Sequence, residues 1–319
     1  MYTKPSVNCI IGNFGNYLSQ YNEEFDSSFL FFVMRKMEFK YIRKENTLKD
    51  VRITHGVDRT LHEFKERFAI QSDFIQVKKS KLHKVFKTTK CPYIIEVSTK
   101  KLNYHLAYKI NHWDMSHYIT ILDNSRKNFT VSDCYIPNKK GNLIYEGKAS
   151  YRNILKAWKN CDRFYYNDVD LELFIKAFKI NKQICKELFI ENMNLFLTKS
   201  IENQRMFAED LVKYPELFSE EELKKHLSVI GVKIQALGLL ASRTYIKEFL
   251  EKHLNYFNSE VFDFIEYDIN EWNKICFGVL KISKNIKPSS FMNISKLILD
   301  ITLKEEKTYS DLLNQIINN

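Results

Sequence analysis

Three residues of this chain have side chains suited to covalent catalysis: Cys9, His117 and Asp133. Cys9 follows Asn8, a residue type that caps helices well, and the apolar residues from position 10 to 18 have helical spacing. A helix that begins at Cys9 would place the thiol at the positive end of the helix dipole, which favours a thiolate. Cys9 is therefore a candidate nucleophile, and the alternative is a small buried residue, the usual fate of an unpaired cysteine.

His117 and Asp133 belong to two segments that read as neighbouring strands. The runs YITIL and FTVS are rich in β-branched and aromatic residues, and a polar stretch separates them. A hairpin with a three-residue loop at 124–126 would set His117 directly opposite Asp133, close enough for the carboxylate to reach the imidazole. Such a pair fixes the tautomer and stabilises the imidazolium. The alternatives are a core or edge histidine and an aspartate that caps the next turn.

Together the three residues would supply a nucleophile, a base and a group that orients the base. Asp123 is a competing orienting group, but it lies in the turn at the far end of the strand. We interpret Tyr104, His105 and Trp113 as walls of a substrate cleft, with plain packing as the alternative. His105, His112, Asp114 and His117 match no familiar metal-ligand spacing, so no metal is expected.

The elements that would hold these residues differ between the two halves of the chain. The first half mixes helical segments, at 10–18 and Leu61–Phe68, with strands at Tyr93–Ser98, Tyr118–Leu122 and Phe129–Ser132. Beyond residue 150 almost every segment has helical spacing, and Ser219 with Glu222 forms a capping box. The sequence thus predicts an α+β domain over residues 1–150, which carries the site, and an all-α domain over residues 151–319.

Composition limits the class of protein. The 319 residues carry a formal net charge of +10, and neither a phosphate-loop nor a dinucleotide-binding glycine motif occurs. We expect a cytoplasmic protein because no apolar run is long enough to span a membrane and the first residues lack a signal-peptide pattern. The six cysteines are scattered, which favours free thiols. The charge favours an acidic partner, and the lysine-rich run at 78–87 reads as a solvated helix face.

The order of these features resembles a known family. A cysteine that opens the first helix, followed by SHYITIL and FTVSD, resembles the papain-like cysteine peptidase fold and, more closely, the catalytic domain of the butirosin-pathway acyltransferase family. The segment from His226 to Glu251, followed by Trp272, is similar to the helical C-terminal domain of that family. The resemblance covers most of the chain and implies a papain-like fold for the first domain.

The resemblance implies amide formation in thiotemplated natural-product (antibiotic) biosynthesis. An acyl or peptidyl group would pass from the phosphopantetheine thioester of an acidic carrier protein to Cys9, and then to a small amine acceptor, with no other cofactor. Related peptidases place a glutamine upstream of the cysteine for the oxyanion hole, and here Asn8 stands nearest. A peptidase or thioesterase with the same residues is the alternative enzyme. A basic binding protein is the non-enzymatic alternative, although no nucleic-acid motif is present and we expect neither nucleic acid nor membrane as a partner.

Overall fold

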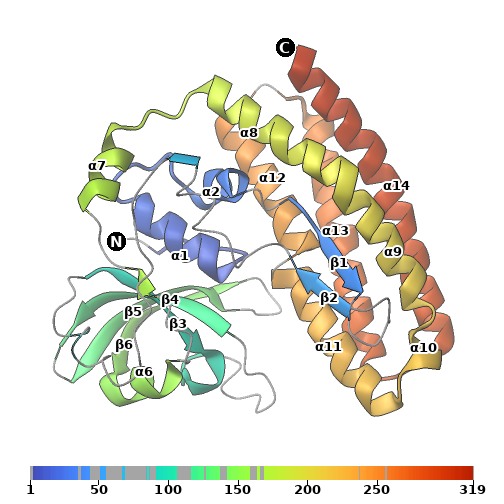
Figure 1. Ribbon diagram of the computed structural model, residues 1–319, viewed down its shortest axis with the longest axis horizontal. Coiled ribbons are helices and arrows are strands. Elements are labelled where there is room, and N and C mark those ends of the chain that lie inside the picture. Colours follow the sequence, from blue (N-terminus) through green and yellow to red (C-terminus); the bar gives the residue numbers. More distant parts are fainter. Residues whose placement is uncertain are drawn as a thin grey trace. The chain divides into compact units, whose positions relative to one another are not determined.

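Two parts of the chain fold around separate hydrophobic cores in the computed structural model (Figure 1). The first unit comprises residues 1–30 and 65–179, and the second comprises residues 31–64 and 180–319. The structure describes residues 3–34, 37–43, 51–54, 67–68, 84, 86, 91–105, 116–125, 127–136, 142–158, 164–165, 169–236, 238–255 and 257–318.

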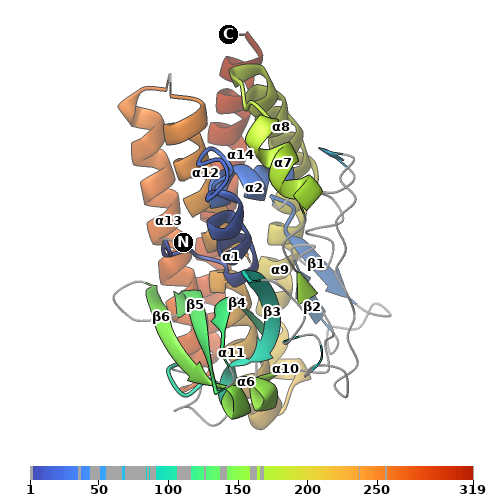
Figure 2. The same ribbon diagram turned by 90° about the vertical axis from the view of Figure 1, so that its left-hand side faces the viewer.

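The first unit is built on a five-stranded antiparallel sheet with the order β6-β5-β4-β3-β7. Its strands are β3 (Tyr93–Ser98), β4 (Ser116–Asn124), β5 (Asn128–Ile136), β6 (Leu143–Ser150) and β7 (Phe164–Tyr165). Figure 2 shows β6, β5, β4 and β3 side by side. The three predicted strands are therefore present, and β6 and β7 are additional to them.

Two helices, α1 (Cys9–Leu18) and α6 (Tyr151–Ala157), cover this sheet. The first unit also contains α7 (Val169–Ala177) and a short 3₁₀ turn, η5 (Thr99–Lys101). The helix α1 packs against β4 and β5, whereas α6 packs against β3, β5 and β6. Successive side chains of β4 point to opposite faces of the sheet. Thr120 donates a hydrogen bond to Asn13 of α1. Ile119 and Ile121 belong to the hydrophobic core that includes Ile154 and Ala157 of α6.

The hairpin between β4 and β5 has a different register from the predicted one. Thr120 pairs with Ser132, and the same register places Asp133 opposite Ile119. Ile119 is two residues after His117 in β4, so Asp133 lies diagonally across from His117. The turn differs because the Ser125 hydroxyl donates to the carbonyl of Asn128 at 2.9 Å and accepts from its amide at 3.1 Å. A bulge after Ile121 shifts the register once more. The expected direct opposition of His117 and Asp133 was wrong, but both remain on the same face of the sheet.

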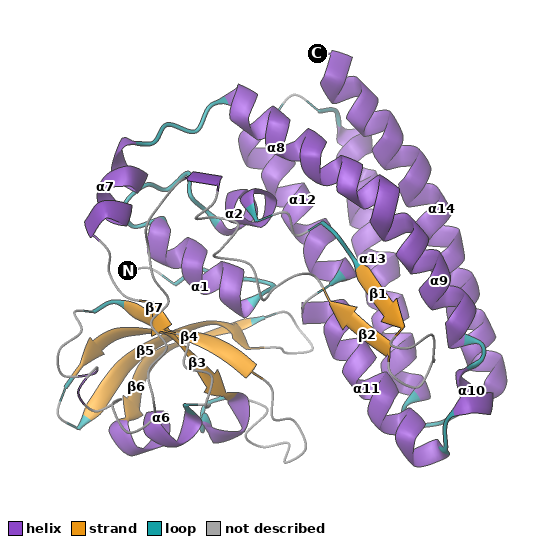
Figure 3. Ribbon diagram, viewed as in Figure 1, coloured by secondary structure: helices purple, strands orange, loops and turns teal. Residues whose placement is uncertain are grey.

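The second unit is mainly helical, as Figure 3 shows. It contains α8 (Lys182–Leu195), α9 (Ile201–Leu211), α10 (Tyr214–Leu217), α11 (Glu220–Ala236), α12 (Leu239–His253), α13 (Ser259–Ile282) and α14 (Pro288–Asn318). A π-helical turn, η6 (Phe196–Ser200), joins α8 to α9, and β1 (Lys40–Arg43) pairs with β2 (Val51–Thr54). The predicted capping box is present, since Ser219 and Glu222 exchange hydrogen bonds at the start of α11. Helix α2 (Ser27–Val33) begins in the first unit and ends in the second.

This division differs from the predicted boundary at residue 150. β1 and the residue before it join the helical unit: the Phe39 amide donates to the Ser200 hydroxyl at 2.8 Å, and the Tyr41 hydroxyl of β1 donates to Asp210 at 3.0 Å. The first unit in turn continues to residue 179, because α6 covers the sheet and Asn22 donates to the carbonyl of Ile175 at the end of α7. The whole is thus a mixed α+β protein with a helical C-terminal region.

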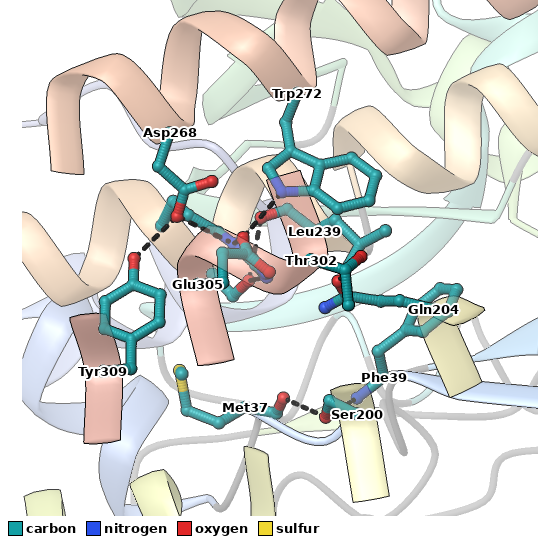
Figure 4. Close-up of polar contacts among 12 residues, drawn as sticks. Met37, Phe39, Ser200, Gln204, Leu239, Asp268, Trp272, Thr302, Glu305 and Tyr309 are labelled. Atoms are coloured by element: carbon teal, nitrogen blue, oxygen red, sulfur yellow. Dashed lines mark hydrogen bonds and ion pairs between the residues drawn. The ribbon is translucent and has the colours of Figure 1, made fainter. Parts of the chain in front are cut away.

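An ionic cluster is buried among the helices of the second unit (Figure 4). Arg243 of α12 donates through Nε to Glu305 of α14 at 2.8 Å and lies 3.5 Å from Asp268 of α13. Trp272 donates to Glu305, and Tyr309 donates to Asp268, each at 2.7 Å. Burial, together with the charge of Glu305, raises the pKa of Asp268 well above its usual value.

Some predicted features lie outside the described residues. These are most of the Leu61–Phe68 helix, most of the lysine-rich run at 78–87, and Cys161. Among the described helices, none combines the length and the apolar character that a membrane crossing requires.

Candidate active site

Cys9 is the first residue of α1, as the sequence predicts. The Asn8 side-chain oxygen accepts from the amides of Ile10 and Ile11 at 2.9 and 3.0 Å, which caps the helix. The Cys9 amide belongs to the first turn, whose N–H groups have no acceptor within the helix. The thiol therefore lies at the positive end of the helix dipole, the position that favours a negatively charged sulfur.

A buried asparagine fixes this turn to the sheet. Asn13 is fully buried and donates from one side-chain nitrogen to the carbonyl of Cys9 at 2.7 Å and to the carbonyl of Tyr118 at 2.8 Å. Its side-chain oxygen accepts from the Thr120 hydroxyl at 2.9 Å. Tyr118 directly follows His117 in β4, so Asn13 links the backbone beside the histidine to the backbone of the cysteine. Sequence reasoning missed this residue, since a polar residue inside an amphipathic helix carries no sign of its partners.

The same helix approaches β5 very closely. A Cβ added to Gly12 would lie 2.3 Å from the Cβ of Ser6 and 2.6 Å from the sulfur of Cys134. The Ser6 amide donates to the Cys134 carbonyl at 2.9 Å, which holds the segment before α1 against the strand. Gly12 is required here because only a glycine leaves room for this contact.

His117 and Asp133 are in direct contact. His117 Nε2 lies 2.8 Å from Asp133 Oδ2, and both side chains are buried. The other carboxylate oxygen, Oδ1, accepts from the amide of Tyr135 at 3.1 Å. With both oxygens engaged, Asp133 is held in the orientation that fixes the imidazole ring.

The charge of His117 depends on its neighbours. Burial lowers the pKa of His117, but the charges of Asp133 and Cys9 and the hydrogen bonds to both raise it more, to about 10. Since Asp133 uses Nε2, the remaining ring nitrogen, Nδ1, is the one available to Cys9. The three side chains thus form a connected set in which the imidazole lies between a sulfur and a carboxylate.

Two of the three predicted cleft residues lie near the pair, His105 beside His117 and Tyr104 near Asp133. The ring centroid of His105 is 5.0 Å from that of His117, and burial beside that ring lowers the pKa of His105 to about 4. Tyr104 stacks on Tyr145, with ring centroids 3.8 Å apart. Burial and the charge of Asp133 raise the pKa of the Tyr104 hydroxyl. The third predicted residue, Trp113, lies outside the described residues.

The same region brings together potential metal ligands. One ligand atom from each of His105, His117 and Asp133 lies within 4.8 Å of the others, and all three residues are buried. His112 and Asp114, the other residues considered from the sequence, lie outside the described part of the chain. Sequence spacing could not find this set because His105 and Asp133 meet only through the sheet.

Other cysteines are in surroundings that keep the thiol protonated. Burial raises the pKa of Cys91 to about 11, with the charge of Asp123 adding to it, and burial raises the pKa of Cys276 to about 12. Burial and the charge of Asp133 also raise the pKa of Cys134, which lies directly beneath the start of α1. None of these three thiols has a histidine among the neighbours that set its pKa. Cys9 differs because its charge and hydrogen bond act on His117.

Comparison with protein-family models found no match to this chain, and comparison with curated proteins found none. The chemistry of the site therefore indicates the function.

Proposed function

We propose that this protein is a cysteine-dependent acyltransferase whose first unit has a papain-like fold. It would form an amide bond by moving an acyl or peptidyl group from a carrier-protein thioester to an amine, through an acyl-Cys9 intermediate, in the cytoplasmic biosynthesis of a thiotemplated antibiotic. The observation that carries the proposal is the position of His117, with Nε2 at 2.8 Å from Asp133 and Cys9 as its other partner.

The first step is thiol exchange. The Cys9 sulfur, as a thiolate beside the His117 imidazolium, attacks the carbonyl carbon of the thioester. The bond from that carbon to the pantetheine sulfur breaks, and the departing thiolate takes the proton of His117. One thioester is replaced by another, so the step is close to neutral in free energy. The proposed donors to the oxyanion are the Cys9 amide, in the first turn of α1, and the side-chain nitrogen of Asn8.

The second step transfers the acyl group to nitrogen. Neutral His117 removes a proton from the amine as the amine attacks the acyl carbon. The carbon–sulfur bond then breaks and regenerates the Cys9 thiolate beside the imidazolium. Asp133 holds the ring through both steps and stabilises its charged form. His117 thus gives one proton to the pantetheine thiolate in the first step and takes one from the amine in the second.

Water in place of the amine would give a hydrolase. The reactive groups are buried, since Cys9, His117 and Asp133 are 9%, 3% and 0% exposed. Exclusion of water lengthens the lifetime of a thioester and favours the amine when one is bound. This burial supports transfer over the alternative, a peptidase or thioesterase with the same residues.

The carrier protein is the partner proposed on grounds of charge. The chain has a net charge of +10, and carrier proteins that bear a phosphopantetheine arm would be attracted if they are acidic. The arm itself delivers the thioester, so the proposal needs no cofactor bound by this chain.

Intact-mass spectrometry tests the proposal. The protein is mixed with an acyl-pantetheine thioester, and the wild type should gain the mass of the acyl group, whereas Cys9→Ala should gain nothing. Cys91→Ala is the matched control and should still be acylated, because Cys91 takes no part in the proposed reaction. It precedes β3, whereas the β3 residue that pairs with His117 is near the end of that strand. An adduct that persists in Cys9→Ala would refute the proposal. Addition of a diamine should release amide, and release of free acid at every amine concentration would favour the hydrolase.

A further inference from the structure

Two imidazoles and a carboxylate meet in one buried place in the first unit. His105 follows η5, His117 lies in β4 and Asp133 lies in β5, yet one ligand atom from each lies within 4.8 Å of the others. Their residues are 5%, 3% and 0% exposed. His117 Nε2 and Asp133 Oδ2 are in direct contact at 2.8 Å.

This donor set has the chemistry of a three-ligand zinc site. Zinc binds imidazole nitrogen and carboxylate oxygen at about 2.0–2.2 Å, and three protein ligands with one water complete a tetrahedron. Ligand atoms in such a site are roughly 3.4 Å apart, as follows from those bond lengths. Separations of up to 4.8 Å must therefore shorten by roughly 1.4 Å, and the 2.8 Å contact between His117 Nε2 and Asp133 Oδ2 must lengthen. We assign the larger of these changes to rotation of the His105 side chain when the ion binds.

We propose that His105, His117 and Asp133 bind a divalent transition-metal ion, preferably Zn²⁺. While the ion is bound, catalysis is inhibited. The ion takes the place of the proton between His117 Nε2 and Asp133 Oδ2, and that proton leaves to solvent. The binding is independent of the proposed acyltransferase activity, whereas the inhibition rests on it. A protein with this site would be switched off by free zinc and restored by a chelator.

Cys9 stays outside the coordination shell in this arrangement. Asp133 marks the Nε2 side of the His117 ring, and the metal binds on that side. Cys9 interacts with the same ring, and the nitrogen that Asp133 leaves available to it is Nδ1. The site is therefore distinct from a zinc ion held between a catalytic cysteine and its histidine, and the two can be told apart by whether sulfur is a ligand.

Co²⁺ is the spectroscopic probe for this site. Titration of the full-length protein with Co²⁺ should give the visible absorption of a tetrahedral ion, which saturates at one equivalent and is displaced by Zn²⁺. His105→Ala should lose these bands, Cys9→Ala should keep them, and His253→Ala, a histidine of α12 in the other unit, is the control that should also keep them. Circular dichroism shows whether His105→Ala is folded.

X-ray absorption of the zinc-loaded wild type gives the ligands without any variant. The expected result is a shell of nitrogen and oxygen at about 2.0 Å with imidazole scattering and no sulfur at about 2.3 Å. A sulfur ligand, loss of the cobalt bands in Cys9→Ala, or no binding at one equivalent would overturn the proposal. Because these readouts do not use activity, failure of the metal site and failure of the acyltransferase are separate results.

Discussion

The protonation of His117 determines what Cys9 can do. Asp133 and Cys9 raise the pKa of His117 from 6.5 to about 10 against the opposing effect of burial. The raised pKa means that the charged ring stabilises the folded state. This stabilisation is complete below pH 6.5 and is lost as the pH rises towards 10. At neutral pH the histidine is therefore an imidazolium.

The titration of His117, followed by nuclear magnetic resonance spectroscopy, tests whether its pKa is raised. The wild type should show a midpoint near 10, and Asp133→Asn should lower the midpoint by more than about one unit, because the neutral amide no longer favours the cation. Asp123→Asn is the matched control, since Asp123 lies towards the far end of β4, and its midpoint should equal that of the wild type. A wild-type midpoint near 6.5 would contradict the assignment.

At the scale of elements, Asn13 aligns the helix that carries Cys9 with the strand that carries His117. Asn13→Ala loses three buried hydrogen bonds, to the carbonyls of Cys9 and Tyr118 and from the Thr120 hydroxyl. We expect this variant to lower the free energy of unfolding by about 2–4 kcal/mol and to slow acylation of Cys9 about tenfold.

Asn16→Ala is the control on the same helix. Asn16 bonds to the backbone of Lys4 and does not touch β4 in any contact described, so its loss should lower stability while acylation remains near the wild-type rate. Chemical denaturation and stopped-flow acylation measure the two quantities. Equal loss of acylation in both variants would show that Asn13 acts through stability alone.

The ionic cluster buried between α12, α13 and α14 should contribute strongly to the stability of the second unit. Arg243→Met leaves Glu305 and Asp268 without their cation in a place with no solvent, which should cost about 3–5 kcal/mol. Arg205→Met removes the partly exposed pair with Glu306 between α9 and α14, and should cost less than about 1 kcal/mol. Thermal unfolding compares them, and similar costs would show that the buried cluster contributes little to stability.

The sequence predicted the elements of the site better than their pairing. Asn8 and the spacing after Cys9 identified α1, because a cap and a helical period are local signals. The contact of His117 with Asp133 was also predicted, but through the wrong register, since the Ser125 turn and the bulge after Ile121 depend on bonds that no periodicity reveals. Asn13 and the approach at Gly12 were missed because they are tertiary contacts of residues that look ordinary in a helix.

At the scale of the whole molecule, the boundary between the units could not be predicted from composition. Residues 31–64 belong to the helical unit although they precede most of the sheet, because Phe39, Tyr41 and Arg43 find their partners on α9 and its neighbours. The helical character of the C-terminal half was clear from its spacing, since amphipathic helices repeat over many residues.

The net charge of +10 predicts that the reaction with a carrier substrate depends on salt. If an acidic carrier protein delivers the acyl group, kcat/KM for the carrier substrate should fall about tenfold as salt is raised from low to high ionic strength. A small pantetheine thioester without the carrier should react at a rate almost independent of salt. Equal salt dependence for the two substrates would contradict the role of charge in carrier recognition.

Alkylation of the cysteines by iodoacetamide at mildly acidic pH, mapped by mass spectrometry, is the most direct test of the site. Cys91 is the more exposed thiol, but it has a pKa of about 11, whereas Cys9 is 9% exposed and interacts with His117. Accessibility alone therefore favours Cys91, and activation favours Cys9. We expect Cys9 to react first, by at least about tenfold, and His117→Ala to abolish this preference. Faster reaction of Cys91, or the same rate at Cys9 with and without His117, would contradict it.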